Sequence, residues 1–285
     1  MQTVLTATKP IAIQGISGSY HEIAARRFFG SEIELKMCDS FPELFQSMER
    51  EQAGFGVVAI ENTVAGTLLP NYALLRNSDF RVIGEVFLRI EHCLMALPGQ
   101  SIEEITEVHS HPMAILQCHE FFKQYPSIRL VERVDTAASA EWIQQEQKRG
   151  VAAIASERAA DYFGLDILVK GIETHKRNFT RFLIISPPQT NAFAIGTPDK
   201  ASLCFSLAHQ IGSLAQILLV LSSHGMNLTK IQSSPILGQE WQYFFHIDLE
   251  YDSYDQYRRS LQAIQHLVGE LKILGEYPRG EKPGA

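Results

Sequence analysis

The chain has 285 residues, of which 45% are hydrophobic, and a formal net charge of −7 at pH 7. This length exceeds a comfortable single core, so two domains, or one domain with a smaller module, are expected. The negative charge and the lack of any Lys/Arg block longer than a pair argue against a nucleic-acid or anionic-membrane partner. A small ligand is the partner class that remains.

The cysteines and the chain start bear on the compartment. Cys38, Cys93, Cys118 and Cys204 form no C-x-x-C pair, which favours reduced thiols over a disulfide framework. The opening MQTVLTATKP lacks the basic and apolar regions of a signal peptide, and no later run reaches about eighteen apolar residues. We therefore expect a cytoplasmic protein.

Strands and helices alternate in the first part of the chain, an order that predicts an α/β layer with a mainly parallel sheet. The first elements are expected at 11–15 (strand), 19–30 (helix), 41–52 (helix) and 56–60 (strand). The strand-like stretch 80–97 is too long for one straight strand, so the chain is expected to cross to a second lobe near Phe87 to Ile90.

The same alternation continues in the expected second lobe. Its elements are predicted at 105–110 (strand), 112–125 (helix), 128–134 (strand), 137–149 (helix) and 151–156 (strand). The strand 181–186 then returns the chain to the first lobe.

The turn-rich stretch PPQTNAFAIGTPDK is interpreted as a linker over residues 188–199. The elements that follow are predicted at 200–208 (strand), 212–224 (helix), 227–234 (strand), 241–250 (strand), 254–268 (helix) and 271–277 (strand). This βαββαβ order is typical of a ferredoxin-like fold. The tail PRGEKPGA is expected to be disordered.

Three predicted helices begin with capping residues. Ser19 and Glu22 have capping-box spacing, Ser110 precedes a helix with Pro112 in its first turn, and Asp135 or Thr136 caps a third helix. Free N–H groups at such helix starts suit an anion, and the repetition favours a site for a dianion. The alternative is that these helices are simply well capped. The first motif is not G-x-G-x-x-G, so a dinucleotide is not expected.

Other chemistries find little support. His109, His111, Cys118 and His119 lack the spacing of a zinc site, and no H-E-x-x-H accompanies them, so no metal is expected. There is no G-x-S-x-G elbow.

Polar residues stand at the ends of two apolar strands. The strand 56–60 runs into Glu61-Asn62-Thr63, the usual topology of an α/β crevice, although Asn62 serving only a local turn is the alternative. In NFTRFLIIS, strand alternation points Asn178 and Thr180 to one face and Arg181 to the other. We expect the first pair to face a ligand cleft.

These motifs occur together in an order that resembles the prephenate dehydratase family. They are GISGSYHEIAA, IENTVAGTL, SHPMAILQC, DTAASA, AAIASERAADYFGL and NFTRF, and they span about residues 11–186. Residues 200–277 resemble the family's C-terminal ACT regulatory domain. The named reaction comes from this resemblance, because periodicity alone gives only the fold class.

The resemblance implies a two-lobed catalytic body like a periplasmic binding protein, followed by a ferredoxin-like ACT domain. The catalytic domain would cover 10–187, with one lobe at about 10–88 plus 180–187 and the other at about 89–179; the ACT domain would cover 200–278. The implied reaction converts prephenate to phenylpyruvate, water and carbon dioxide for phenylalanine biosynthesis, with no metal or cofactor.

The family's roles carry over by motif. Thr180 would act at the departing hydroxyl, and the catalytic residues would be Thr180, Asn62, Gln117 and Ser110. The substrate-binding residues would be Ser19, Tyr20, Thr136, Asn178, Arg181, Glu61 and Thr63. Met113 stands where the family usually has Gln, and Ala73 stands where it often has Asp. These departures call into question the geometry beside the site more than the reaction itself.

The resemblance also implies L-phenylalanine as effector and a homodimer or homotetramer formed through ACT domains. The effector residues would be Gly212, Ser213, Leu214, Ala215, Asn227, Leu228, Gln232 and Ser233. Gln232 and Ser234 replace the family's Glu and Arg, so we expect retuned or weakened inhibition with binding retained. Two other functions stay open: an arogenate dehydratase, and a catalytically silent amino-acid sensor.

Overall fold

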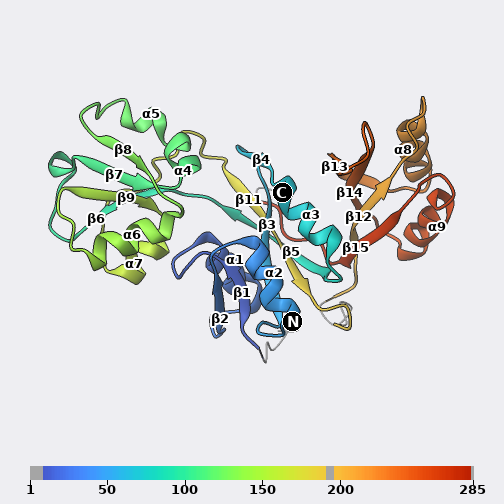
Figure 1. Cartoon of the computed structure of the whole chain (residues 1–285), viewed down its shortest axis with the longest axis horizontal. Coiled ribbons are helices and arrows are strands. Elements are labelled where there is room, and N and C mark those ends of the chain that lie inside the picture. The colour runs from blue at the N-terminus through green and yellow to red at the C-terminus, as the bar shows by residue number, and fades with distance from the viewer. Residues whose placement is uncertain (1–8, 191–195, 284–285) are drawn as a thin grey trace. The chain divides into compact units, whose positions relative to one another are not determined.

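The computed structural model describes residues 9–190 and 196–283, which form two compact units. The N-terminal unit is built from Ala7–Leu68 and Val86–Phe182, and the C-terminal unit from Leu69–Glu85 and Leu183–Glu281. Two strands, β5 (Arg81–Arg89) and β11 (Phe179–Ser186), begin in one unit and end in the other (Figure 1). None of the helices in the described part of the chain is long and apolar enough to cross a membrane.

In the first lobe of the N-terminal unit, β1 lies between β2 and β3, and β3 also neighbours β11, in the order β11-β3-β1-β2. β1 pairs in parallel with β2 and β3, and β3 pairs antiparallel with β4. Their bounds are β1 Ile11–Gln14, β2 Leu35–Cys38, β3 Phe55–Asn62 and β4 Gly66–Thr67. Helices α1 (Tyr20–Phe29) and α2 (Phe41–Glu49) pack on this sheet. The apolar residues of β1 and residues 57–60 of β3 are buried, as expected for parallel strands covered on both faces.

The second lobe has a five-stranded sheet in the order β10-β6-β9-β7-β8. These strands are β6 Cys93–Ala96, β7 Glu107–Ser110, β8 Arg129–Glu132, β9 Val151–Ala155 and β10 Asp166–Val169, with a short 3-10 helix at Ile102–Glu104.

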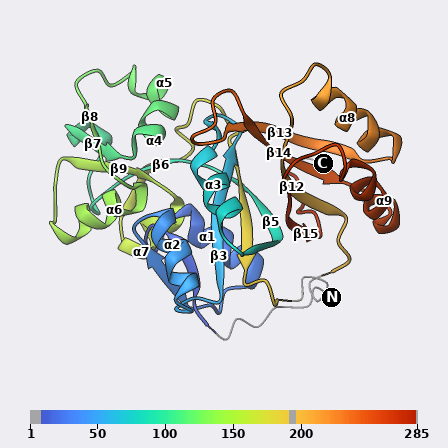
Figure 2. The same cartoon turned by 45° about the vertical axis from the view of Figure 1, so that its right-hand side comes forward.

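Both faces of this sheet are covered by helices. Alternation along β6 sends Cys93 and Met95 into one core and Leu94 and Ala96 into the other. The helices are α4 Pro112–Gln117 and α5 His119–Phe122 on one face, and α6 Thr136–Gln145 and α7 Glu157–Phe163 on the other (Figure 2).

Two segments join the lobes. The predicted crossover is confirmed, with the break between β5 and β6 at residues 90–92. Residues 173–178 lead back to β11. The two segments lie side by side: Ile90 N–H donates to the Asn178 carbonyl at 2.8 Å, and the N–H of Ile172, just before the second segment, donates to the His92 carbonyl at 2.9 Å.

The prediction of one helix over 112–125 was wrong, because the helix is interrupted at Cys118, between α4 and α5. The Gln117 carbonyl accepts the N–H of Thr174 at 2.8 Å, so a residue from a crossing segment takes the place of the next helical donor. Strands β2 and β10 and helix α7 were not predicted.

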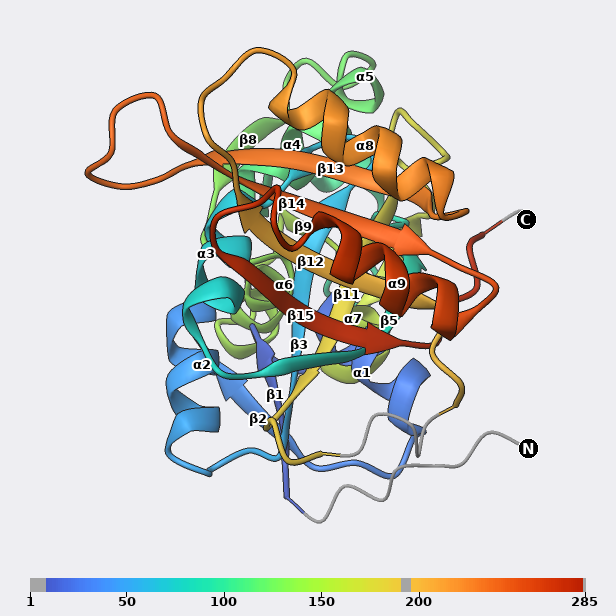
Figure 3. The ribbon, with the colours of Figure 1, turned by 90° about the vertical axis from the view of Figure 1, so that its right-hand side faces the viewer.

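The C-terminal unit contains the predicted βαββαβ module. Its elements are β12 Lys200–Ser206, α8 Ser213–Ser223, β13 Asn227–Pro235, β14 Tyr243–Glu250, α9 Tyr254–Ile264 and β15 Leu271–Tyr277. The strands lie in the order β13-β14-β12-β15 with antiparallel neighbours, and α8 and α9 cover one face (Figure 3). This confirms the ferredoxin-like fold.

Helix α3 (Leu69–Asn77) and the start of β5 also belong to this unit. The ring of Tyr72 lies 4.7 Å from that of His246, and the Arg76 guanidinium lies 3.9 Å from the Phe244 ring centroid. β15 meets β5 in parallel at Gly275 and Val82, so close that a Cβ on Gly275 would lie 2.1 Å from the Val82 carbonyl oxygen.

Part of the expected disordered tail is held in place. Arg279 Nε lies 2.8 Å from Asp199 Oδ2, and the Gly280 N–H donates to Glu85 Oε1 at 3.0 Å. The prediction of disorder was therefore wrong for these two residues. Residues 284–285 of the tail and residues 191–195 of the predicted linker lie outside the described residues.

Candidate functional site

A cavity of about 450 Å³ lies in the N-terminal unit and is lined by residues of both lobes. This volume falls within the range of about 300–1,000 Å³ that is usual for small-molecule sites. The first lobe contributes Ser19, Tyr20 and His21 at the start of α1, together with Asn62 and Thr180. The second lobe contributes His111, Met113, Gln117, Asp135 and Thr136, and His92 comes from a crossing segment.

Asn62 and Thr180 meet where β3 ends and β11 begins. Asn62 Nδ2 donates to Thr180 Oγ1 at 2.9 Å, and both side chains line the cavity. Asn62 Oδ1 accepts the backbone N–H groups of Val64 (2.9 Å) and Ala65 (2.7 Å), so a local turn also fixes its amide. The turn and the cavity interpretations of Asn62 are therefore compatible.

A chain of neutral polar side chains continues from this pair. Asn62 Nδ2 also donates to Asn178 Oδ1 (2.8 Å), and Asn178 Nδ2 donates to Gln117 Oε1 (2.9 Å). His92 Nε2 lies 2.9 Å from the same Gln117 oxygen, and His92 Nδ1 lies 3.0 Å from the Tyr20 hydroxyl. Residues of both lobes and both crossing segments thus share one hydrogen-bond network.

The structure brings six of the eleven predicted site residues to the cavity wall: Ser19, Tyr20, Asn62, Gln117, Thr136 and Thr180. Asn178 was expected to face the cleft with Thr180, but it does not line the cavity; it is buried behind the wall and supports Asn62 and Gln117. Alternation is confirmed along β11, because Thr180 and Phe182 line the cavity and Arg181 does not.

The remaining predicted residues lie away from the cavity wall. Glu61 and Thr63 flank Asn62 but do not line the cavity. The Thr63 hydroxyl accepts the N–H of Phe179 (2.9 Å) and donates to the Arg177 carbonyl (3.1 Å), which gives it a structural role. Ser110 is fully buried at the end of β7, and its hydroxyl donates to the Ile154 carbonyl at 2.7 Å.

Two of the three predicted caps are confirmed. The Ser19 hydroxyl accepts the Glu22 N–H, and Asp135 rather than Thr136 caps α6. The prediction that Ser110 caps α4 was wrong. His111 is the cap, because its Nδ1 accepts the Met113 N–H at 3.1 Å, while the Ser110 hydroxyl is engaged with β9.

Sequence reasoning missed three cavity histidines: His21, His92 and His111. Burial lowers the pKa of His21 to about 4, and its ring packs edge-on against Phe41 and Phe182. Burial also lowers the pKa of His92, against the opposing effects of the Gln117 hydrogen bond and the Glu173 charge. The position of His92 at the expected crossover was a signal that could have found it.

The cavity wall carries almost no formal charge. No Lys or Arg of the described chain lines it, and Asp135 is its one carboxylate. An anion here would be met by neutral donors, namely side-chain amides, hydroxyls and the N–H groups at the starts of α1 and α6. Such a site would bind a carboxylate by hydrogen bonds that burial strengthens.

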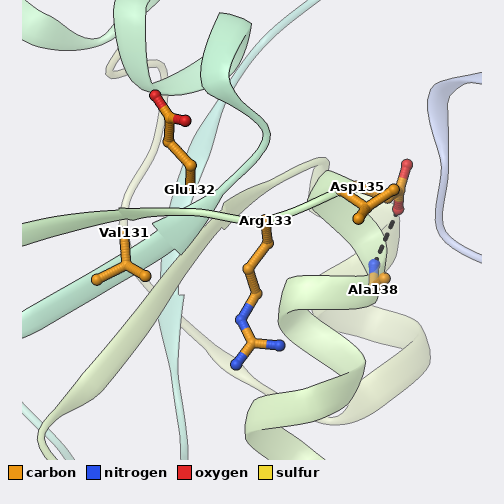
Figure 4. Close-up of a pocket in the computed structure, with 6 residues that line it drawn as sticks. Val131, Glu132, Arg133, Asp135 and Ala138 are labelled. Atoms are coloured by element: carbon orange, nitrogen blue, oxygen red, sulfur yellow. Dashed lines mark hydrogen bonds between the residues drawn. The ribbon is translucent and has the colours of Figure 1, made fainter.

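Asp135 also borders a second cavity, of about 480 Å³, on the second lobe (Figure 4). Its Oδ1 accepts the Ala138 N–H at 2.9 Å. The side chains of Glu132, the last residue of β8, and of Arg133, which follows it, point to opposite sides of the chain (Figure 4). The Arg133 guanidinium stacks on Trp142, 3.7 Å from its ring centroid, and its Nε donates to His109 Nδ1 at 2.9 Å. The described chain contains no group of three or more His, Cys, Asp or Glu side chains placed to hold a metal ion.

The two lobes are in contact beside the cavity. The Ser156 hydroxyl donates to the Gly18 carbonyl at 2.5 Å, and Arg158 Nη2 lies 2.9 Å from Glu22 Oε1. Gly18 has φ +85°, and a Cβ there would lie 2.7 Å from Ala159 Cα. This closed arrangement requires glycine at position 18.

The family model described as prephenate dehydratase matches residues 11–190, the part that contains the cavity. The chain belongs to the prephenate dehydratase family. The Escherichia coli (strain K12) bifunctional chorismate mutase/prephenate dehydratase is 32% identical over 272 residues, covering 94% of this chain and 70% of that protein. The Arabidopsis thaliana arogenate dehydratase/prephenate dehydratase 2 is 34% identical, covering 94% of this chain and 72% of that protein.

Solved structures extend the prephenate dehydratase likeness over almost the whole chain. The prephenate dehydratase of Arthrobacter aurescens, solved in complex with L-Phe, matches with TM-score 0.84 and 26% identity, covering 95% of this chain and 90% of that one. A protein described as GqqA, a novel type of quorum quenching acylase, matches with TM-score 0.85 and 28% identity, covering 96% and 99%.

Proposed function

We propose that the chain is a carbon-oxygen lyase that converts prephenate to phenylpyruvate, water and carbon dioxide. In this reaction the bond to the ring carboxylate breaks, its electron pair moves into the ring, and the ring hydroxyl leaves. One proton must reach the departing oxygen for water to form. The ring becomes aromatic, so the enzyme needs mainly to hold the substrate and assist hydroxide departure.

The observation that carries this proposal is the Thr180 hydroxyl, which faces the cavity while its oxygen accepts a hydrogen bond from Asn62 Nδ2 at 2.9 Å. An alcohol held in this way is a hydrogen-bond donor toward a leaving oxygen. Gln117 and Thr136 are placed to orient the carboxylates without titrating.

The test is a pair of substitutions at Thr180, with disappearance of prephenate as the measurement. Thr180→Ala should lower kcat by about 10²–10⁴-fold with a much smaller change in KM, because the lost group acts on the leaving hydroxyl. Thr180→Ser should recover part of the loss, since it restores a hydroxyl. Thr106→Ala serves as the control, because the Thr106 hydroxyl donates to the Gly150 carbonyl and does not line the cavity. Equal activity of all these proteins would contradict the role of Thr180, and binding without turnover by the wild type would favour the silent sensor.

Arogenate is the second candidate substrate, and it differs by an amino group where prephenate has a ketone. Asp135, the carboxylate of the cavity wall, is a suitable partner for an ammonium group, and arogenate dehydratases are among the relatives. Asp135→Asn keeps an oxygen to cap α6, so any change can be assigned to the charge. If arogenate is the substrate, this variant should lose kcat/KM for arogenate and not for prephenate.

An acylase activity has less support from the site. Acyl transfer by a hydroxyl nucleophile requires an adjacent base. In the described part of the chain, no hydrogen bond joins a histidine to the hydroxyl of Ser19, Ser110, Thr136 or Thr180.

We further propose that the C-terminal module is an ACT domain that binds L-phenylalanine between two copies of this chain. The candidate effector residues Gly212–Ala215 begin α8, whereas Asn227 and Leu228 follow its far end. An eleven-residue helix spans about 16 Å, so one amino acid cannot contact both sets within one chain. A second copy would bring them together, and β13, the edge strand of this sheet in the described part of the chain, could face it.

Gln232 and Ser234 lie on β13 near the buried His246, and the Ser234 hydroxyl is 3.2 Å from His246 Nε2. Ser233 lies between them on the exposed face. We therefore propose that Gln232 and Ser234, in place of the family's Glu and Arg, alter the coupling between the effector site and the active site. Binding of phenylalanine itself would then depend on the backbone groups around α8. Calorimetry showing no phenylalanine binding at millimolar concentration would contradict this, and light scattering checks the oligomer.

The remaining parts of the proposal are the domain division at 10–187, 188–199 and 200–278, and a cytoplasmic location. Cys38, Cys93, Cys118 and Cys204 are buried free thiols, which suits a reducing compartment.

A further inference from the structure

We propose that His92 is a positioning residue that sets the direction of the hydrogen bonds leading to Thr180, and thereby keeps the Thr180 proton directed at the cavity. The role in turnover rests on the proposed function. The protonation state assigned to His92 rests on the hydrogen-bond network alone.

The direction of the network is fixed first at Asn62. Its Oδ1 accepts two backbone N–H groups, those of Val64 (2.9 Å) and Ala65 (2.7 Å). Backbone amides can only donate, so the other end of the side chain must be the NH₂ group. Both of its protons are used, toward Asn178 Oδ1 and Thr180 Oγ1.

The orientation then passes to the next two amides. Because Asn178 Oδ1 accepts from Asn62, the NH₂ group of Asn178 must be the end that faces Gln117, at 2.9 Å. The Gln117 atom that receives it must be the carbonyl oxygen. Turning the Gln117 amide over would bring two NH₂ groups against each other.

His92 Nε2 lies 2.9 Å from that same Gln117 oxygen. A bare nitrogen there would place a lone pair against a carbonyl lone pair, so Nε2 must carry the ring proton. Nδ1 of the neutral ring is then an acceptor, and the Tyr20 hydroxyl lies 3.0 Å away as its donor. Tyr20 can also donate to the Glu91 carbonyl at 2.7 Å, so this end of the network constrains the ring less than Gln117 does.

The residue is well placed to enforce this arrangement. His92 is 3% exposed, and its backbone N–H donates to the buried Glu173 carboxylate at 2.9 Å. The backbone of the crossing segment therefore fixes the position of the ring, and the ring N–H fixes the orientation of the Gln117 amide.

The consequence appears at Thr180. Its oxygen already accepts from Asn62, and no acceptor for its proton is found among the described residues. The proton is left to donate into the cavity, where a leaving hydroxyl would lie. If His92 carried its proton only on Nδ1, Gln117 would turn, Asn178 would lose its acceptor, and the support for Asn62 would weaken.

Nuclear magnetic resonance tests the protonation state directly. The chain has ten histidines, so individual rings can be resolved by long-range proton–nitrogen correlation on the histidine-labelled wild type. The His92 signals are assigned by their absence in His92→Gln, and they show which ring nitrogen carries the proton. We expect a neutral ring protonated at Nε2 in the ligand-free protein. A ring protonated at Nδ1 overturns the proposal, whether or not the protein acts on prephenate.

Two substitutions test the consequence for turnover. The amide of His92→Gln reaches about the position of Nε2 and can donate to Gln117, whereas that of His92→Asn reaches only about the position of Nδ1. We expect kcat for prephenate to fall less than about fivefold in His92→Gln and about 100-fold in His92→Asn, with little change in KM. Equal kcat in the two variants overturns the proposal. If one variant fails to fold, the other supplies the His92 assignment, and the protonation state of the wild-type ring decides the proposal.

Discussion

Two buried polar clusters, one in each unit, are built on opposite plans. The cavity network of the N-terminal unit joins amides, hydroxyls and a neutral imidazole, and no formal charge lies in the run from Tyr20 to Thr180. In the C-terminal unit, Lys200 Nζ lies 2.9 Å from Glu85 Oε1 and 3.5 Å from Glu250 Oε1, and Lys200 is 1% exposed.

The difference follows from what each cluster must do. A buried ion pair makes the loss of any one partner costly, so it holds strands in a fixed register. Neutral groups can exchange hydrogen bonds with an arriving ligand and do not leave a charge stranded. We therefore expect substitutions in the charged cluster to change stability, and substitutions in the neutral network to change kcat.

Lys200→Met should have the largest effect on stability. It removes the cation between two buried carboxylates and should lower the unfolding free energy by about 3–5 kcal/mol. The measurement is urea unfolding followed by far-ultraviolet circular dichroism. The double variant Lys200→Met, Glu85→Met should recover part of the loss. A Lys200→Met protein of normal stability with a reduced kcat would break the comparison.

Gly18→Ala tests whether substrate binding at the neutral network requires the contact between the two lobes. The new Cβ would lie 2.7 Å from Ala159 Cα, so the lobes must separate or shift. We expect KM to rise by about tenfold or more, since Gln117 and Thr136 would move away from Asn62 and Thr180.

Gly30→Ala is the matched control for this substitution. Gly30 also has a positive φ, +94°, but no atom lies within 4 Å of the added Cβ. It should lose about 1–3 kcal/mol of stability from backbone strain and keep its KM. A similar KM in both variants would show that lobe contact does not limit binding.

The smallest effect is expected at His246, a neutral group within the C-terminal unit. Burial, aided by Arg76, lowers its pKa to about 4. The unfolded chain therefore binds the proton more readily, and the stability contributed above about pH 6.5 is lost as the pH falls toward 4. His246→Asn should flatten this decline by about 1 kcal/mol per pH unit, measured by urea unfolding at about pH 7 and about pH 5. An unchanged slope would show that another group titrates instead.

Local patterns in the sequence predicted the parts of the structure that depend on near neighbours. Alternation along β11 put Thr180 toward the cavity and Arg181 away from it, and the spacing of Ser19 and Glu22 predicted the cap of α1. The order of strands and helices in the C-terminal module is likewise a local signal, and it was right. Each of these depends on a period or a spacing of a few residues.

The errors arose where distant segments compete for the same groups. Ser110 lost its capping role because its hydroxyl meets Ile154, 44 positions away, and the helix after Pro112 breaks because Thr174 takes the Gln117 carbonyl. His92 and the Lys200 to Glu85 pair, 115 positions apart, are likewise contacts that no local pattern reveals.

The segments that connect the lobes, residues 90–92 and 173–178, also supply His92 and Asn178 to the cavity network. The connections between the lobes therefore also carry part of the hydrogen-bond network behind Thr180. On the proposed function, a bend in these segments that admits a ligand would also change the hydrogen bonds that His92 and Asn178 make behind Thr180. We therefore expect that opening of the lobes and turnover exclude each other.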